Sequence, residues 1–179
     1  DARRDRYIAE YALPKADAAM LAADSETGCY FDAAVEIAGT DRAKQVANWM
    51  LGDLTAHVNA AGIAIGEARV TPAMLAELIG LVEDGTISGK QAKQVFAEAA
   101  ETGDAPGAIV EARGMKQVSD TGAIEAVVAA VLEANPAEVE SYRAGKTSVI
   151  GFFVGQVMRE MRGQGNPAVV NEVLRRMLG

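Results

Sequence analysis

Cysteine and histidine are almost absent from this sequence, which has only Cys29 and His57 among 179 residues. A single cysteine forms no internal disulfide, as is typical of proteins from a reducing compartment. A catalytic thiolate–imidazole pair would need both residues together, and no Cys/His cluster has the spacing of a metal site. We therefore interpret Cys29 as a small buried hydrophobe and His57 as a residue at the border of an apolar helix face, and we expect no metal.

Aromatic residues and long apolar runs are also scarce. Aromatic residues make up 5% of the chain and hydrophobic residues 50%, which predicts a sizeable core built mainly from aliphatic side chains. No apolar run approaches the roughly 20 residues that span a bilayer, and no stretch resembles a signal peptide. We expect a cytoplasmic protein with no membrane partner, and, since it begins at Asp1 without methionine, a piece of a longer one.

Positive charge is in short supply overall, since the formal net charge is −8. This argues against a general nucleic-acid coat and against DNA binding. Residues 140–179 nevertheless hold six basic and three acidic side chains, so the rest of the chain carries −11. An acidic body with a basic end suits positioned contact with an anion. The six basic side chains are Arg143, Lys146, Arg159, Arg162, Arg175 and Arg176.

Period-two alternation with hairpin turns is missing, whereas apolar residues recur at helical spacing along most of the chain. The fold class is therefore predicted as all-α, in helical hairpins and small bundles. The expected helices cover residues 3–13, 17–23, about 30–39, 41–58, 72–84, 89–101, 105–112, 120–134, 136–144, 147–162 and 167–178.

Capping residues stand where several of these helices should begin. Three prolines directly follow a Thr or Asn, which places a cap before the first helical position. Ser88 followed by Gln91 has the spacing of a capping box. The predicted caps before proline are Thr71, Asn135 and Asn166, and Asp41 and Ser119-Asp120 are further predicted caps.

The segment 142–167 is the strongest candidate for contact with a partner. Residues Gly151, Gly155, Arg159 and Arg162 are spaced by four, four and three, so they form one strip of the predicted helix 147–162. Glycine inside a helix costs about 1 kcal/mol against alanine, and close approach of a ligand or another backbone is the usual compensation. The alternative is that the two glycines only admit a neighbouring helix while the arginines are solvated.

Two short glycine motifs do not extend to nucleotide-binding sites. Gly145-Lys146-Thr147 would need a glycine five residues earlier to form a phosphate loop, and Glu140 stands there. Gly163-Gln164-Gly165 lacks the third glycine of a dinucleotide fingerprint and is interpreted as a helix–helix connector.

Several segments of the second half carry a family pattern. They are residues 87–96, 117–120, 135–136, 142–158 and 166–174. Together they resemble the tail domain of the B subunit of the aspartyl/glutamyl-tRNA amidotransferase (GatB), a module that also occurs in stand-alone YqeY-like proteins. Residues 3–7 and 48–54 resemble the helical domain that precedes the tail in GatB and that stand-alone proteins lack. The resemblance implies a helical domain at 1–67 and a tail domain at 70–179, with lobes at about 70–115 and 119–179.

The resemblance also implies a function. Such enzymes convert Glu-tRNA(Gln) or Asp-tRNA(Asn) to the amide with ATP and with ammonia from glutamine, and GatB works with the amidase (A) subunit and the small (C) subunit. We expect ATP and Mg²⁺ in the cradle domain of the parent, no cofactor here, and a chain that binds tRNA(Gln) or tRNA(Asn) without being catalytic alone. The residues expected to contact RNA are Lys90, Lys93, Arg143, Lys146, Arg159 and Arg162.

One departure and one alternative accompany this interpretation. Family members often have lysine in the connector where this chain has Gln164, so a phosphate contact there is missing or moved. The alternative function is a YqeY-type protein-interaction module, in which Gly151 and Gly155 admit a partner helix and the acidic body faces a basic protein.

Overall fold

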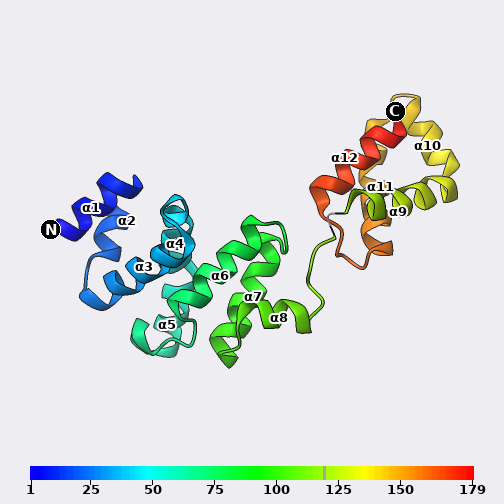
Figure 1. Cartoon of the computed structure of the whole chain (residues 1–179). Coiled ribbons are helices and arrows are strands. Elements are labelled where there is room, and N and C mark those ends of the chain that lie inside the picture. Colours follow the sequence, from blue (N-terminus) through cyan, green and yellow to red (C-terminus); the bar gives the residue numbers. More distant parts are fainter. Residues whose placement is uncertain (119) are drawn as a thin grey trace. The chain divides into compact units, whose positions relative to one another are not determined.

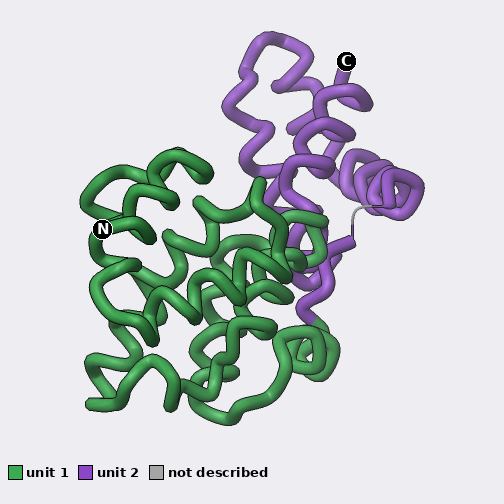
Figure 2. Tube along the Cα trace, turned by 60° about the vertical axis from the view of Figure 1, so that its left-hand side comes forward, with its two compact units in different colours: residues 1–114 green, residues 115–179 purple. Residues whose placement is uncertain are grey.

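The chain forms two compact units. The computed structural model describes residues 1–118 and 120–179, and it divides into unit 1, Asp1–Gly114, and unit 2, Met115–Gly179 (Figure 2). All regular structure in the described residues is helical, apart from an isolated parallel bridge between Val118 and Gly165. The prediction of an all-α fold is therefore confirmed.

The helices of unit 1 (Figure 1) are accompanied by three short segments that depart from regular α-helix. Short 3-10 turns lie at Thr40–Arg42 and Ile65–Glu67, and a π-helical segment at Met50–Leu54 joins α4 to α5. The α-helices are α1 Ala2–Tyr11, α2 Lys15–Leu21, α3 Ser25–Ala38, α4 Ala43–Trp49, α5 Thr55–Ala61, α6 Pro72–Glu83, α7 Gly89–Thr102 and α8 Pro106–Ala112.

Unit 2 follows the predicted helix order closely. A 3-10 turn at Thr147–Val149 leads into α11, which ends two residues earlier than expected. The α-helices are α9 Thr121–Ala134, α10 Pro136–Arg143, α11 Ile150–Glu160 and α12 Pro167–Leu178.

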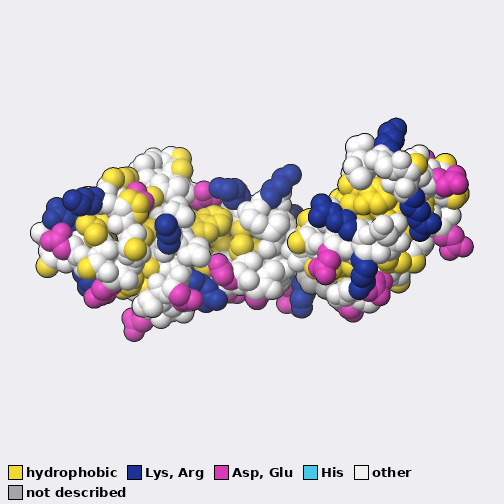
Figure 3. All heavy atoms as spheres, turned by 90° about the horizontal axis from the view of Figure 1, so that it is seen from above, with side chains coloured by type: hydrophobic (Ala, Val, Ile, Leu, Met, Phe, Trp, Pro, Cys, Tyr) yellow, Lys and Arg dark blue, Asp and Glu magenta, His cyan; other side chains and the backbone are white. Residues whose placement is uncertain are grey.

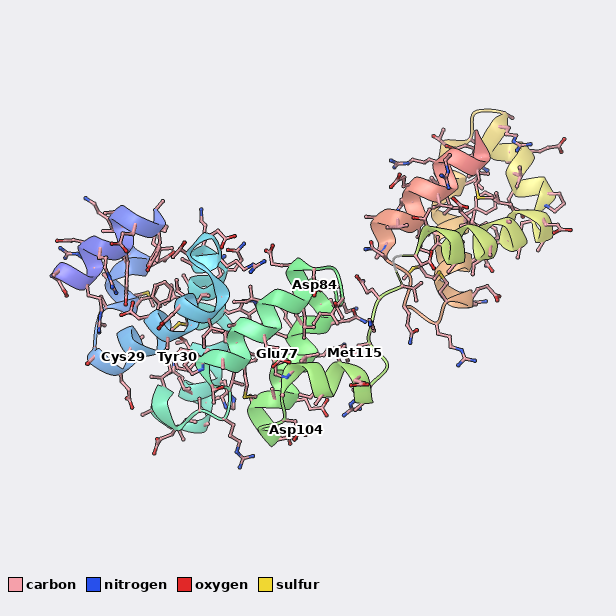
Figure 4. The ribbon with its side chains drawn as sticks, in the orientation of Figure 1. Cys29, Tyr30, Glu77, Asp84, Asp104 and Met115 are labelled. Carbon is pink, nitrogen blue, oxygen red and sulfur yellow. The ribbon has the colours of Figure 1, made fainter. Side chains whose placement is uncertain are left out.

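Unit 1 is built around the packing of α3 against α6. The Tyr30 hydroxyl donates a hydrogen bond of 2.7 Å to the Val70 carbonyl just before α6, and burial raises the pKa of this phenol. Glu77 of α6 accepts a hydrogen bond of 2.9 Å from the Gly107 amide, which ties α8 to the same helix (Figure 4). Elements from both sides of the expected boundary between residues 67 and 70 thus share one compact unit, and the domain division at 1–67 and 70–179 stays a prediction.

Most predicted caps are confirmed. Thr71 and Asn166 accept hydrogen bonds from the backbone amides of Met74 and Ala168, at 3.2 and 3.1 Å. Ser88 and Gln91 form the reciprocal capping box, with distances of 3.1 and 2.9 Å. Asp120 likewise caps α9, whereas its predicted companion Ser119 lies outside the described residues.

Two cap predictions are wrong. The side chain of Asn135 makes no capping hydrogen bond to α10. Its Nδ2 donates instead to the Val131 carbonyl at 2.8 Å, at the end of the preceding helix α9. Asp41 lies inside a 3-10 turn that the Arg42 amide closes on the Gly39 carbonyl at 3.0 Å, and α4 begins after this turn. In both places the chain satisfies backbone groups of the preceding segment instead of the following helix.

Cys29 is exposed, so its interpretation as a buried hydrophobe is wrong. Beside it, the side chain of Arg3 lies across Gly28 so closely that a Cβ atom there would clash with it. The Arg3 guanidinium donates to the Cys29 sulfur at 3.8 Å and also pairs with Asp32 at 3.6 Å. A charged side chain therefore occupies the place beside the thiol that an apolar core would have filled.

An apolar stripe of α11, with its residues at helical spacing, forms part of the core of unit 2. Phe153 and Val157 are fully buried, and Ile150, Val154 and Met158 pack against the same cluster from its edge. The buried partners are Ile124, Val128 and Val131 of α9 and Val170, Val173, Leu174 and Leu178 of α12.

The connector between α11 and α12 is held by the chain that enters unit 2. The Val118 amide donates to the Gln164 carbonyl at 2.6 Å, and the Asn166 amide donates to the Val118 carbonyl at 2.9 Å. Gly165 is the glycine whose position requires close approach, because a Cβ atom there would lie 2.9 Å from the Met161 sulfur. Close approach was predicted from the sequence at Gly151 and Gly155, and not at Gly165.

Candidate nucleic-acid interface

Lys90 and Lys93 lie on the exposed side of α7 in unit 1. Their position follows from the helix pattern, because Ala92, Val95 and Phe96 turn the opposite side of α7 into the core. In the part of the chain that the structure describes, Lys90 makes no ion pair.

Lys93 differs from Lys90 because its charge is compensated. Its Nζ lies 3.1 Å from Asp53 Oδ1 in the π-helical segment, and 5.7 Å from the ring centre of Trp49. The Trp49 ring in turn packs against Phe96, with ring centroids 5.6 Å apart. A phosphate would have to compete with Asp53 for this ammonium, so Lys93 is the weakest of the six predicted contacts.

Arg143 and Lys146 stand at the turn between α10 and α11 in unit 2. The Arg143 Nε donates a hydrogen bond of 3.3 Å to the Leu178 carbonyl at the end of α12. Gly145 takes a left-handed backbone with φ 108°, which ends the helix as predicted and leaves Lys146 exposed on the next turn.

Arg159 and Arg162 stand at the other end of α11. Arg159 lies in the last turn of the helix, where a cation interacts favourably with the helix dipole. Arg162 lies beyond the helix and has φ 54°, an uncommon left-handed conformation for a side chain of this size. The predicted strip therefore continues only to Arg159, and Arg162 belongs to the turn that follows.

Three of the basic side chains around α11 have in common that their positive charge is unpaired. Among the described residues, Lys146, Arg159 and Arg162 are exposed and make no ion pair. Lys146 precedes and Arg162 follows a helix of 11 residues, which is about 16 Å long. The cations thus suit a run of several phosphates better than a single one.

On the face shown in Figure 3, the Lys and Arg side chains stand in several separate groups with acidic side chains between them. Lys90 and Lys93 belong to unit 1, whereas the other four predicted contacts belong to unit 2. A patch formed by all six therefore stays a prediction.

Gly151 and Gly155 are exposed on α11. Among the described residues, no atom would come within 4 Å of a Cβ atom added at either glycine. In the described part of unit 2, therefore, no neighbouring helix packs closely against these two glycines. Close approach by another molecule stays a prediction.

The remaining candidates for chemistry are isolated. His57 lines a surface hollow of about 440 Å³ with Asp53, Lys93 and Glu101. No group of three or more His, Cys, Asp or Glu side chains arranged to hold a metal ion occurs in residues 1–118 and 120–179. Nor does any helix in these ranges have the length and apolar character needed to cross a membrane.

A comparison with family models decides the affiliation of the chain. The model described as the GatB domain matches residues 29–178. The chain belongs to the GatB domain family. The match runs from within α3 to the end of α12 and therefore includes parts of both units.

Curated relatives of this GatB domain chain are named as the B subunit of aspartyl/glutamyl-tRNA(Asn/Gln) amidotransferase. The protein from Anaeromyxobacter dehalogenans (strain 2CP-C) is 52% identical over 99% of this chain, and that from Rhizorhabdus wittichii is 51% identical over 100%. The protein from Solidesulfovibrio magneticus is 48% identical over 100% of the chain. The chain covers 37% of the length of each of these relatives and matches their C-terminal part.

Proposed function

We propose that this chain is the tRNA-binding portion of an amidotransferase GatB protein. It holds tRNA(Gln) or tRNA(Asn) while the parent enzyme, together with the amidase (A) and small (C) subunits, converts the attached Glu or Asp to the amide. The steps that use ATP and Mg²⁺ take place in the part of GatB that lies outside this chain, so the chain is not catalytic alone. The names of the relatives and the length that they share with this chain support the proposal.

The observation that carries the RNA-binding role is the set of uncompensated cations around α11. Lys146, Arg159 and Arg162 are exposed without carboxylate partners in the described residues, so their charge is available to phosphates. Folded RNA is recognised largely through its shape, phosphates and 2′-hydroxyls, which does not require a strongly basic protein. Correct placement of the reacting ester contributes strongly to rate, which explains the value of a binding portion.

The test is a fluorescence anisotropy titration of labelled tRNA(Gln) and tRNA(Asn) at several salt concentrations. Lys146→Ala and Arg159→Ala should each weaken binding by about three- to tenfold and lower the slope of log affinity against log salt by about 1. The matched control is Arg113→Ala, because Arg113 is exposed but already paired with Glu98 at 3.1 Å.

We expect less than a twofold change for Arg113→Ala. Binding without salt dependence, or equal losses for all three variants, would contradict the proposal. The alternative, a protein-interaction module, predicts two results together: no salt-dependent binding of tRNA in this titration, and a protein partner that remains bound in a pull-down from cell extract after ribonuclease has digested the RNA.

A further inference from the structure

An open groove runs between α9 and α11 of unit 2, two helices that lie against each other (Figure 1). Its volume is about 470 Å³. One side of the groove is lined by Ala126, Val127, Ala130, Val131, Ala134 and Asn135, and its three alanines are spaced by four, so that they stand in line over about 12 Å. All three alanines are exposed, so this face of α9 is uncovered in unit 2.

The α11 side of the groove is made of Gln156 and Glu160. Phe152 stands one turn before Gln156 on the same strip of the helix and remains 40% exposed, although its neighbour Phe153 is fully buried. The strip of α11 that contains these residues thus begins at the exposed ring of Phe152, outside the groove, and reaches the Glu160 carboxylate about 12 Å further along the helix.

The charge of the groove is one-sided. Glu160 is its only charged lining residue in the part of the chain that the structure describes, and it makes no ion pair there. An apolar floor with an unpaired carboxylate at its edge is complementary to an apolar surface that carries a cation.

We propose that this groove binds one amphipathic α-helix of a second protein, with apolar side chains on the alanines of α9 and a Lys or Arg side chain on Glu160. A row of small residues lets a helix axis come close, and helix-in-groove recognition uses anchors at spacings of three and four residues. The 12 Å row of alanines matches about two turns of such a helix.

Other occupants fit the groove less well. A phosphate backbone would meet Glu160 and an apolar floor, whereas the unpaired cations Lys146 and Arg162 lie at the ends of α11. A second copy of the chain docked through the same groove would bring like charges together, since a two-fold contact places each Glu160 near its own symmetry mate.

The test uses the full chain labelled with ¹⁵N and two synthetic 16-residue helical peptides as probes. Both peptides carry the same Leu/Ala face, and their flanking positions are Lys in one and Glu in the other. We expect the Lys peptide to shift the amide resonances of α9 and α11 and to bind at least about tenfold more tightly than the Glu peptide. Equal binding of the two peptides, or shifts confined to other helices, would overturn the proposal.

Variants of exposed positions keep the test independent of folding. Ala130→Gln fills the groove with a good helix former and should weaken binding of the Lys peptide by about tenfold or more. Ala129→Gln is the matched control, since Ala129 is exposed on the same helix but does not line the groove. Glu160→Gln should weaken binding of the Lys peptide by about two- to fivefold.

The outcome also separates this proposal from tRNA binding. The affinity of Ala130→Gln for tRNA should be unchanged, because none of the cations around α11 lines the groove. Equal losses for Ala129→Gln and Ala130→Gln would overturn the proposal. So would tRNA shifting the groove resonances and displacing the Lys peptide, because the groove would then belong to the RNA surface.

Discussion

The two units differ in the share of their basic side chains that form ion pairs with carboxylates. Unit 1 holds 18 acidic and 10 basic side chains, whereas unit 2 holds seven of each. Within the described residues, Arg3, Arg4, Arg6, Lys93 and Arg113 of unit 1 all pair with carboxylates. In unit 2 the corresponding pair within the described ranges joins Arg176 to Glu125, which leaves the cations around α11 unpaired.

This difference shows that net charge is a poor guide to where an anion will bind. Exposed ion pairs contribute at most about 1 kcal/mol to stability, so the pairs of unit 1 matter mainly because they cancel positive charge locally. The neutral unit thus presents more available positive charge than the acidic one. Local pairing, which the sequence does not display, decides which lysines and arginines can contact phosphates.

The largest expected effect tests whether the units unfold separately. Phe153→Ala removes a fully buried ring from the core of unit 2 and should lower its free energy of unfolding by about 3–5 kcal/mol. Trp49, the one tryptophan of the chain, lies in unit 1, so its fluorescence reports unit 1 alone while calorimetry follows both units.

The control for this prediction is Phe152→Ala, which truncates the neighbouring ring that is 40% exposed and should cost much less. If Phe153→Ala shifted the unfolding transition followed by Trp49 fluorescence as much as the transition of unit 2, separate unfolding of the two units would be contradicted. They would then form one cooperative system.

A second prediction concerns acid and unit 1. Asp24 caps α3 by accepting hydrogen bonds of 2.8 Å from the Thr27 amide and from its hydroxyl, and these bonds lower the pKa of the carboxyl below its ordinary value of 3.8. The stabilisation is therefore present above about pH 4 and is lost as the pH falls through the lowered pKa. Asp24→Ala should destabilise unit 1 by about 1 kcal/mol at pH 7 and by less in acid.

Asp24→Asn separates the cap from the charge. Asparagine is also a good cap, so this variant should keep most of the stability at pH 7 and lose the dependence on acid. Urea titrations monitored by Trp49 fluorescence at pH 7 and near pH 3 measure both effects. A loss from Asp24→Ala that stays constant with pH would show that the carboxylate is not the stabilising form.

The smallest expected effect concerns the ion pair between Lys93 and Asp53 in unit 1. Lys93→Ala should change tRNA affinity by less than about twofold, because Asp53 already compensates this ammonium. Asp53→Asn should then raise the affinity slightly, by releasing Lys93, and Lys93→Ala in the Asp53→Asn background should reverse the gain. A large loss from Lys93→Ala alone, in the same anisotropy titration, would mean that phosphate displaces Asp53.

Features that depend on neighbouring residues in the chain could be predicted. The helices between residues 72 and 178, the capping box at Ser88 and the cap at Thr71 follow from spacing within three or four positions, and the structure has them. The apolar stripe of α11 is equally local, because its period identifies the buried face before any partner is known.

Features set by distant partners could not be predicted. Lys93 and its partner Asp53 are 40 positions apart in the sequence, and Arg3 and Cys29 are 26 apart. Neither pairing can therefore be recognised from the spacing of neighbouring residues. Gly165 is similar, because its need for space comes from Met161 and Val170 in the folded connector. The candidate site is thus known from the sequence as a set of residue types, and only the fold shows which of them are already occupied.

The bridge between Val118 and the connector has a mechanical consequence. Residues 115–117 enter unit 2 through a pair of backbone hydrogen bonds at Gln164 and Asn166, beside the left-handed Arg162. A force on the segment that enters unit 2 therefore acts on the turn between α11 and α12, next to a cation proposed to bind RNA. The backbone hydrogen bonds that hold the incoming segment and the cation proposed to bind RNA thus lie within the same few residues, 162–166.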